Sequence, residues 1–152
     1  MTRSVAVRLF FLAGGLVLLG TQAAQAAGPY QFFSVPPCRI ADTRNAVGPL
    51  GSPALAAGST RTFPVNGICA VPQTAKAVAV NVTVVNPTAG GHLTLYPAGT
   101  ALPLASTINF RSGIVRANNA VLAVGASGQV SVFCGMASGS TDFVLDVSGW
   151  FE

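Results

Sequence analysis

Charge is the scarcest property of this sequence. Only 8% of its 152 residues are charged, whereas about a quarter is usual for a soluble domain. There is one histidine, and the four acidic residues are Asp42, Asp142, Asp146 and Glu152. One histidine and four acidic residues cannot build a zinc site without recruiting Cys134. They also provide few groups for acid–base catalysis. We therefore expect no bound metal, no cofactor, no catalytic residues and no enzyme activity.

The basic residues form no patch. Two of them, Arg3 and Arg8, lie near the N-terminus, and the other six are spread along the chain: Arg39, Arg44, Arg61, Lys76, Arg111 and Arg116. Nucleic-acid-binding domains gather Lys and Arg on one face or along one element, so no nucleic-acid partner is expected. Nucleophile-elbow, phosphate-loop and HExxH motifs are also missing from the sequence.

The only long apolar run is at the N-terminus. Arg3 and Arg8 precede or flank the apolar and glycine residues of 9–20, and Ala24 and Ala26 place small side chains where signal peptidase reads them. A run of about 12 residues is too short for a permanent membrane anchor; the alternative is an N-terminal membrane helix that is never cleaved. We expect a signal peptide at 1–26 and a single domain at 27–152, secreted or on the cell surface without a transmembrane anchor.

Beyond the leader, short alternating segments are separated by Gly, Pro and Ser turns, and no window has a helical apolar stripe. In the clearest segment, 76–85, every second residue is valine (Val78, Val80, Val82 and Val84), as in a strand with one buried face. About eight such strands predict an all-β fold, an antiparallel β-sandwich of jelly-roll type, with a closed β-barrel as the alternative. The next strand, 92–96, follows across a Pro/Gly loop, which predicts a hairpin. A long loop is expected at 45–60.

Several segments resemble a secreted bacterial β domain, found as a module in surface and secreted proteins, for which no activity is established. They cover nearly all of 27–152 in order: 37–44 (PCRIADTR), 67–72 (GICAVP), 77–83 (AVAVNVT), 93–97 (LTLYP), 106–110 (STINF), 117–119 (ANN) and 146–151 (DVSGWF). Trp150 stands where that domain usually has Tyr.

Three cysteines in an exported chain leave one pair and one extra residue, and the spacing alone allows all three pairings. In the domain that this chain resembles, the cysteine before Arg and the one before Val-Pro occur together. The resemblance therefore implies a Cys38–Cys69 disulfide. Cys134 is then left over, and its position beside Val132 favours a buried, small apolar residue over a reactive thiol.

Asp42, Arg44 and Asp146 form the first candidate site. Two carboxylates can serve as the acid and base of a glycosidase. We favour an ion pair in which Arg44 binds Asp42 or Asp146 and joins the first strand to the last.

The second candidate site is a ligand face made of three amphipathic aromatic residues, His92, Tyr96 and Trp150. Four asparagines also lie within expected strands, where Asn is disfavoured: Asn81, Asn109, Asn118 and Asn119. Their amides either satisfy neighbouring backbone groups or bind a glycan.

These features favour a non-catalytic module that binds a glycan, another cell-envelope component or a partner protein. The alternative is a structural unit that assembles with its own copies, because few charges protect the strand edges from pairing. A secreted hydrolase comes third.

Overall fold

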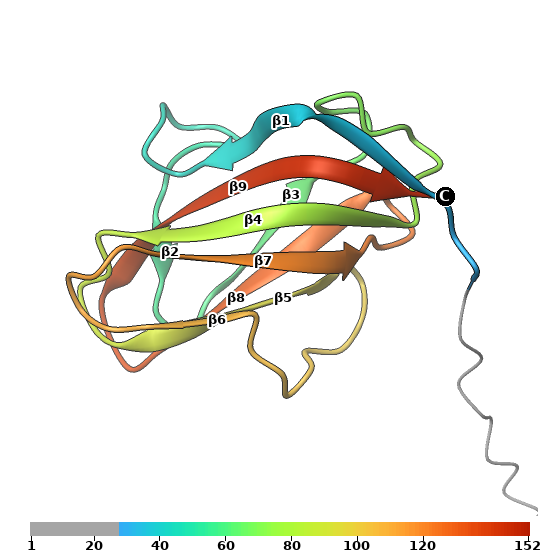
Figure 1. The fold of residues 1–152 in the computed structure, drawn as a ribbon. Coiled ribbons are helices and arrows are strands. Elements are labelled where there is room, and N and C mark those ends of the chain that lie inside the picture. Colours follow the sequence, from blue (N-terminus) through green and yellow to red (C-terminus); the bar gives the residue numbers. More distant parts are fainter. Residues whose placement is uncertain (1–27) are drawn as a thin grey trace, which may run out of the picture.

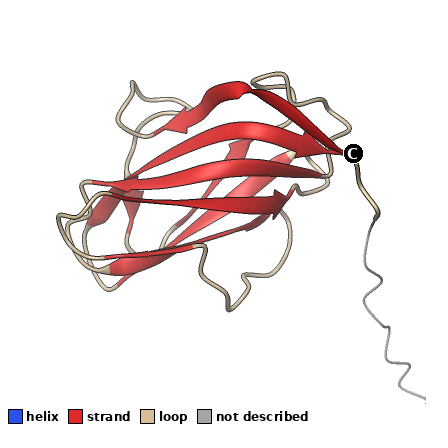
Figure 2. Cartoon of the chain, in the orientation of Figure 1, coloured by secondary structure: helices blue, strands red, loops and turns tan. Residues whose placement is uncertain are grey.

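The structure is a computed structural model that describes residues 28–152, so the expected signal peptide lies outside the described residues. This part of the chain is built of strands and loops (Figures 1 and 2). The strands are β1 (Phe32–Asp42), β2 (Leu55–Ala56), β3 (Thr60–Pro64), β4 (Ala77–Val85), β5 (Gly91–Pro97), β6 (Ile108–Phe110), β7 (Arg116–Ala123), β8 (Gln129–Met136) and β9 (Ser140–Phe151). Residues 28–152 contain no helix that is long and apolar enough to cross a membrane.

The strands form two antiparallel sheets that face each other (Figure 1). The first sheet has the order β1-β9-β4-β7, with the two-residue β2 also paired to β9; the second has the order β3-β8-β5-β6. When β2 is left out, this is the 1-8-3-6 and 2-7-4-5 order of a jelly roll. The predicted sandwich is confirmed, the closed barrel is not formed by residues 28–152, and the ninth strand is the short β2 within the expected 45–60 loop.

The predicted hairpin of 76–85 with 92–96 is wrong. β4 pairs with β7 and β9 in the first sheet, whereas β5 pairs with β6 and β8 in the second. Most consecutive strands of a jelly roll lie in different sheets, and the loop after Val85 crosses the sandwich. Turn residues between two strands with alternating apolar side chains are compatible with either connection, a hairpin or a crossing to the other sheet.

Alternation along the strands fills the space between the sheets with apolar side chains. The four valines of β4 are at most 3% exposed, as the sequence predicts, while the residues between them are half-buried on the outer face. Phe63 of β3 and Phe143 of β9 meet across the core with ring centroids 5.1 Å apart, and both are fully buried. The two sheets therefore share one core.

The edge strand β1 is irregular where the chain contains two consecutive prolines. Its register against β9 shifts between Ser34 and Cys38, the stretch that holds Pro36 and Pro37. Proline has no backbone N–H to donate to a ladder, so it belongs at an edge or a bulge. The pairing resumes at Cys38 and Arg39, and this places the Arg39 side chain opposite β9 on the outer face of the first sheet.

Candidate functional site

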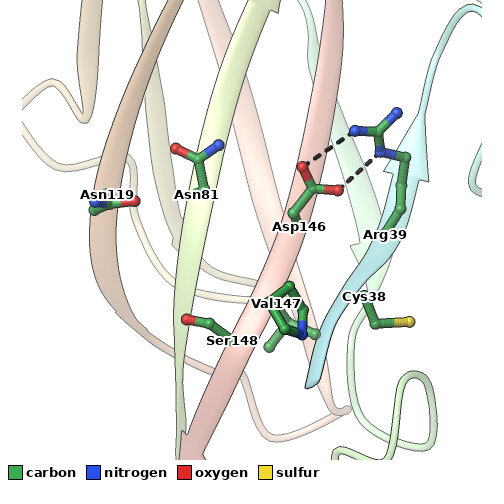
Figure 3. A pocket seen from close by; sticks show the side chains of 8 residues that line it. Cys38, Arg39, Asn81, Asn119, Asp146, Val147 and Ser148 are labelled. Carbon is green, nitrogen blue, oxygen red and sulfur yellow. Dashed lines mark hydrogen bonds and ion pairs between the residues drawn. The ribbon is translucent and has the colours of Figure 1, made fainter. Parts of the chain in front are cut away.

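A row of four polar side chains crosses the outer face of the first sheet. Arg39 of β1 is directly opposite Asp146 of β9, Asp146 is opposite Asn81 of β4, and Asn81 is opposite Asn119 of β7. Directly opposite residues of antiparallel strands point to the same side of the sheet. Figure 3 shows the four side chains side by side on adjacent strands. We call Arg39, Asp146, Asn81 and Asn119 the polar row.

The polar row lies in a shallow groove of about 580 Å3. Pro37, Cys38 and Arg39 line it on the β1 side, and Asp146, Val147 and Ser148 of β9 line its middle. A second hollow continues past Ser148 and Asn119 over Ala79 and Val121. Small side chains beside the polar row therefore leave an elongated depression that crosses the strands.

Hydrogen-bonding capacity remains in the polar row. Arg39 donates from Nε and Nη2 to the two oxygens of Asp146, at 2.8 and 3.2 Å. The Asn81 amide donates to Thr83 Oγ1 (3.3 Å), and the Asn119 side chain is exposed. Half of the Arg39 side chain is exposed, so this ion pair contributes less than about 1 kcal/mol to stability. The groove thus holds hydrogen-bonding side chains that a ligand can reach.

Next to the polar row, Asp42 is a buried acceptor for two arginines. Its carboxylate accepts from Arg44 Nε and Nη2 at 2.8 and 2.6 Å, from the Arg44 backbone N–H and from Arg39 Nη1 at 3.1 Å. Asp42 is only 4% exposed. Arg44 thus pairs with Asp42, while Asp146 pairs with Arg39, and Arg39 rather than Arg44 connects the first strand to the last.

These contacts make the stability depend on pH below pH 4. The hydrogen bonds from Arg44 lower the pKa of Asp42 from 3.8 to about 2, against the opposing effect of burial. A carboxyl with a lowered folded-state pKa stabilises the fold above its unfolded-state pKa, and this contribution is lost as the pH falls towards 2. We expect Asp42 to contribute about 2 kcal/mol, measured as the loss of unfolding free energy in urea between pH 5 and pH 2.

In Asp42→Asn this loss should be absent, and Arg44→Ala should reduce it. If wild type and Asp42→Asn lose the same free energy over this pH range, Asp42 does not carry the dependence.

An aromatic ring lies at one end of the groove face. Gly149 of β9 is opposite Ala79 on the outer face, and the ring of Phe32 lies over Gly149 so closely that a Cβ there would collide with it. Phe32 is 49% exposed, and its ring contacts Phe151 at a centroid distance of 5.0 Å. The outer face therefore combines an exposed ring, small residues and the polar row.

The expected ligand face of His92, Tyr96 and Trp150 is not formed. His92 and Tyr96 lie on β5 in the second sheet, and Trp150 lies on β9 in the first. Trp150 is opposite Val78, packs against the core and stacks on Phe33 with centroids 4.2 Å apart. The register shift between Ala79 and Val80 turns the Trp150 side chain inward, and the sequence has no signal for it.

Cys38 and Cys69 form a disulfide, with Cα atoms 5.7 Å apart, and Cys134 is a free, fully buried cysteine. The Cys134 thiol points at the Leu55 carbonyl oxygen (3.8 Å), and burial raises its pKa. The neighbouring β5 residue opposite Cys134 is Leu93, so His92 points to the other side of the sheet. Burial and a raised pKa are typical of a structural cysteine.

Two of the expected asparagines lie outside the groove. Asn118 donates to the Thr107 carbonyl oxygen (2.8 Å), and Asn109 donates to Ser106 Oγ (3.0 Å). Asn81 and Asn119 are in the polar row, and the residue that sequence analysis missed is Arg39. The sequence does contain an indication of it: Arg39 lies in the first strand and Asp146 in the last. These two residues are opposite each other once the first and last strands pair.

Among residues 28–152, no group of three or more His, Cys, Asp or Glu side chains is placed to hold a metal ion.

No family model matches the chain, and no curated protein matches it. Two solved structures of tobacco streak virus coat protein are similar to it: a dimer with TM-score 0.40 and 9% identity over 83% of this chain and 89% of that one, and a second crystal form with TM-score 0.39 and 10% identity over 83% and 90%. Likeness at this level says nothing about function, and the fold assignment follows from the strand order. The family resemblance in the sequence stays a prediction; the chain is a β-sandwich of jelly-roll order.

Proposed function

We propose that this protein is a secreted or cell-surface β-sandwich module that binds a polysaccharide in the groove on its first sheet and catalyses no reaction. The observation that carries this proposal is the alignment of Arg39, Asp146, Asn81 and Asn119 across four adjacent strands, in a groove of about 580 Å3. Planar carboxylate, amide and guanidinium groups offer paired donors and acceptors, which suit the adjacent hydroxyls of sugars.

A glycan fits this face better than a protein partner does. Polar side chains cross the groove in a row, and the paired Arg39 and Asp146 leave the lining without net charge, whereas protein interfaces usually centre on buried apolar anchors. The exposed ring of Phe32 gives a sugar a surface to stack on at one end. The scarcity of charge in the whole chain also favours a neutral polysaccharide over an anionic one.

The carboxylates near the groove support a role without catalysis. A glycosidase needs one carboxyl group with a raised pKa to act as general acid. The pKa of Asp42 is lowered to about 2 instead, and a guanidinium binds both Asp42 and Asp146. Both carboxylates hold Arg39 in place.

Binding to insoluble polysaccharides tests the proposal. The 27–152 protein is mixed with peptidoglycan, cellulose, chitin, xylan and glucan beads, and the bound fraction is measured. Asn81→Ala and Asn119→Ala each remove one hydrogen-bonding amide from the groove, and we expect each to weaken binding up to about tenfold.

Asn109→Ala is the matched control, because Asn109 is an exposed strand asparagine on the second sheet. It should bind as the wild type does. Equal binding by all three variants, or no binding to any of the five polysaccharides, contradicts the proposal.

A further inference from the structure

The edges of the two sheets differ in how well they are protected. In the described part of the chain, the edge strands are β1 and β7 in the first sheet and β3 and β6 in the second. An edge strand presents unpaired N–H and C=O groups that can pair with another strand, unless prolines, bulges, charges or short length prevent it. β1 contains Pro36 and Pro37 with two register shifts, β3 has Arg61 and ends at Pro64, and β6 has only three residues.

β7 has the fewest of these protections. It is eight residues long, contains no proline and pairs with β4 from Arg116 to Ala123 without a register shift. Its single charge is at its first residue. Most of its side chains are small and exposed, and Val121 is 64% exposed. The other edge of β7 has no strand partner within residues 28–152.

β7 is also held in place as a regular strand. The Asn118 side chain donates to the Thr107 carbonyl oxygen at 2.8 Å, which ties β7 to the loop before β6. In Figure 1, β7 is the outermost strand of the first sheet on the side opposite β1. An ordered strand edge has its backbone groups already set to receive a further strand, and the one charge of β7 is at its first residue.

We propose that β7 is a dimerisation edge that pairs with β7 of a second copy of this chain. The two strands run antiparallel about a twofold axis at Asn119, and the first sheets of both copies become one continuous sheet. A twofold interface uses the same surface on both partners, so it requires a strand that is complementary to itself. β7 meets this requirement.

The complementarity follows from the register. With the twofold axis at Asn119, the Asn119 residues of the two copies are directly opposite each other, and Ala117 is opposite Val121 of the second copy. Arg116 is opposite Leu122 of the second copy and far from the other Arg116, so the only charge of the strand meets no like charge. Cβ atoms of directly opposite residues are about 4.5–5.5 Å apart, which lets the two Asn119 amides hydrogen-bond.

This dimer would also lengthen the groove. The polar row of one copy ends at Asn119, so in the dimer it continues into the polar row of the other copy. A single polysaccharide chain then spans both grooves. This consequence rests on the proposed function, whereas the pairing of β7 does not depend on any ligand.

The mass of the 27–152 protein in solution tests the pairing. Size-exclusion chromatography with light scattering should give twice the chain mass for the wild type. Asn119→Lys puts the lysines of the two copies directly opposite each other, where like charges oppose pairing, and we expect its mass to fall to that of one chain. Thr60→Lys places the same charge on an exposed residue of edge strand β3 and should leave the mass doubled. Circular dichroism confirms that both variants are folded.

A monomeric wild type, or an Asn119→Lys variant that stays dimeric, overturns the proposal. Asn81 is in the polar row but lies on β4, away from the β7 edge. The Asn81→Ala variant should therefore keep the doubled mass while it loses affinity for polysaccharide. Failure of the dimer and failure of the proposed function are therefore distinguishable.

Single cysteines locate the axis. Asn119→Cys should form a disulfide between copies on mild oxidation, because this residue is opposite itself, whereas Ala117→Cys and Val121→Cys alone should not. The native Cys134 is buried and does not compete. Cross-linking through residue 121 and not through residue 119 would place the axis elsewhere and overturn the proposed register.

Discussion

Removal of the Cys38–Cys69 disulfide is expected to destabilise the protein by about 3–4 kcal/mol. The bond joins residues 31 positions apart, and the constraint that a closed loop of this length puts on the unfolded chain corresponds to that free energy. For a domain of this size, this loss lowers the melting temperature by about 10–15 °C. The measurement is thermal and urea unfolding of Cys38→Ser/Cys69→Ser beside the wild type.

The disulfide also supports the groove, because Cys38 lines it while Cys69 belongs to the turn before β4. Reductant should bring the wild type down to the melting temperature of the double variant and leave the double variant unchanged. A non-reducing peptide map checks the pairing independently. Detection of a Cys69–Cys134 peptide, or equal stability of the wild type and the double variant, would show that this bond does not join β1 to that turn.

Phe143→Ala is expected to destabilise the fold by about 3–5 kcal/mol, the usual loss for a fully buried phenylalanine. The Phe143 ring contacts Phe63 from the opposite sheet, so its removal leaves a cavity between the two layers. Phe32→Ala is the control with the same chemical change at a residue that is 49% exposed, and we expect less than about 1 kcal/mol for it.

The measurement is the unfolding free energy of both variants in urea. If Phe32→Ala costs as much as Phe143→Ala, the core does not lie where the two sheets meet. A double variant with Phe63→Ala should lose less than the sum of the two single losses, since each substitution already removes the contact between the rings.

The local pattern of the sequence is enough to predict single strands. The alternating valines of β4 predict a strand and its buried face, because both properties are set by neighbours in the sequence. Strand pairing depends on the whole topology. β4 lies between β7 and β9, both more than 30 residues away, and the turn after Val85 looks the same whether the chain makes a hairpin or crosses the sandwich.

The candidate site was predictable only in part for the same reason. The sequence identifies Asn81 and Asn119 as asparagines within strands and Asp146 as a candidate for an ion pair. Their alignment with Arg39, however, depends on the registers of three strand pairs. Trp150 shows the opposite case. A register shift in β9 turns it into the core, whereas simple alternation with Ser148 would have exposed it.

Amide spectra during a titration test the central claim most directly. The polysaccharide that binds best is supplied as soluble oligosaccharides, and the signals of the isotope-labelled 27–152 protein are followed by NMR. We expect the side-chain amides of Asn81 and Asn119 and the backbone amide of Asp146 to shift with saturation, while His92 and Tyr96 on the second sheet stay unchanged. Shifts that gather around His92 and Tyr96, with the polar row unaffected, would contradict the account.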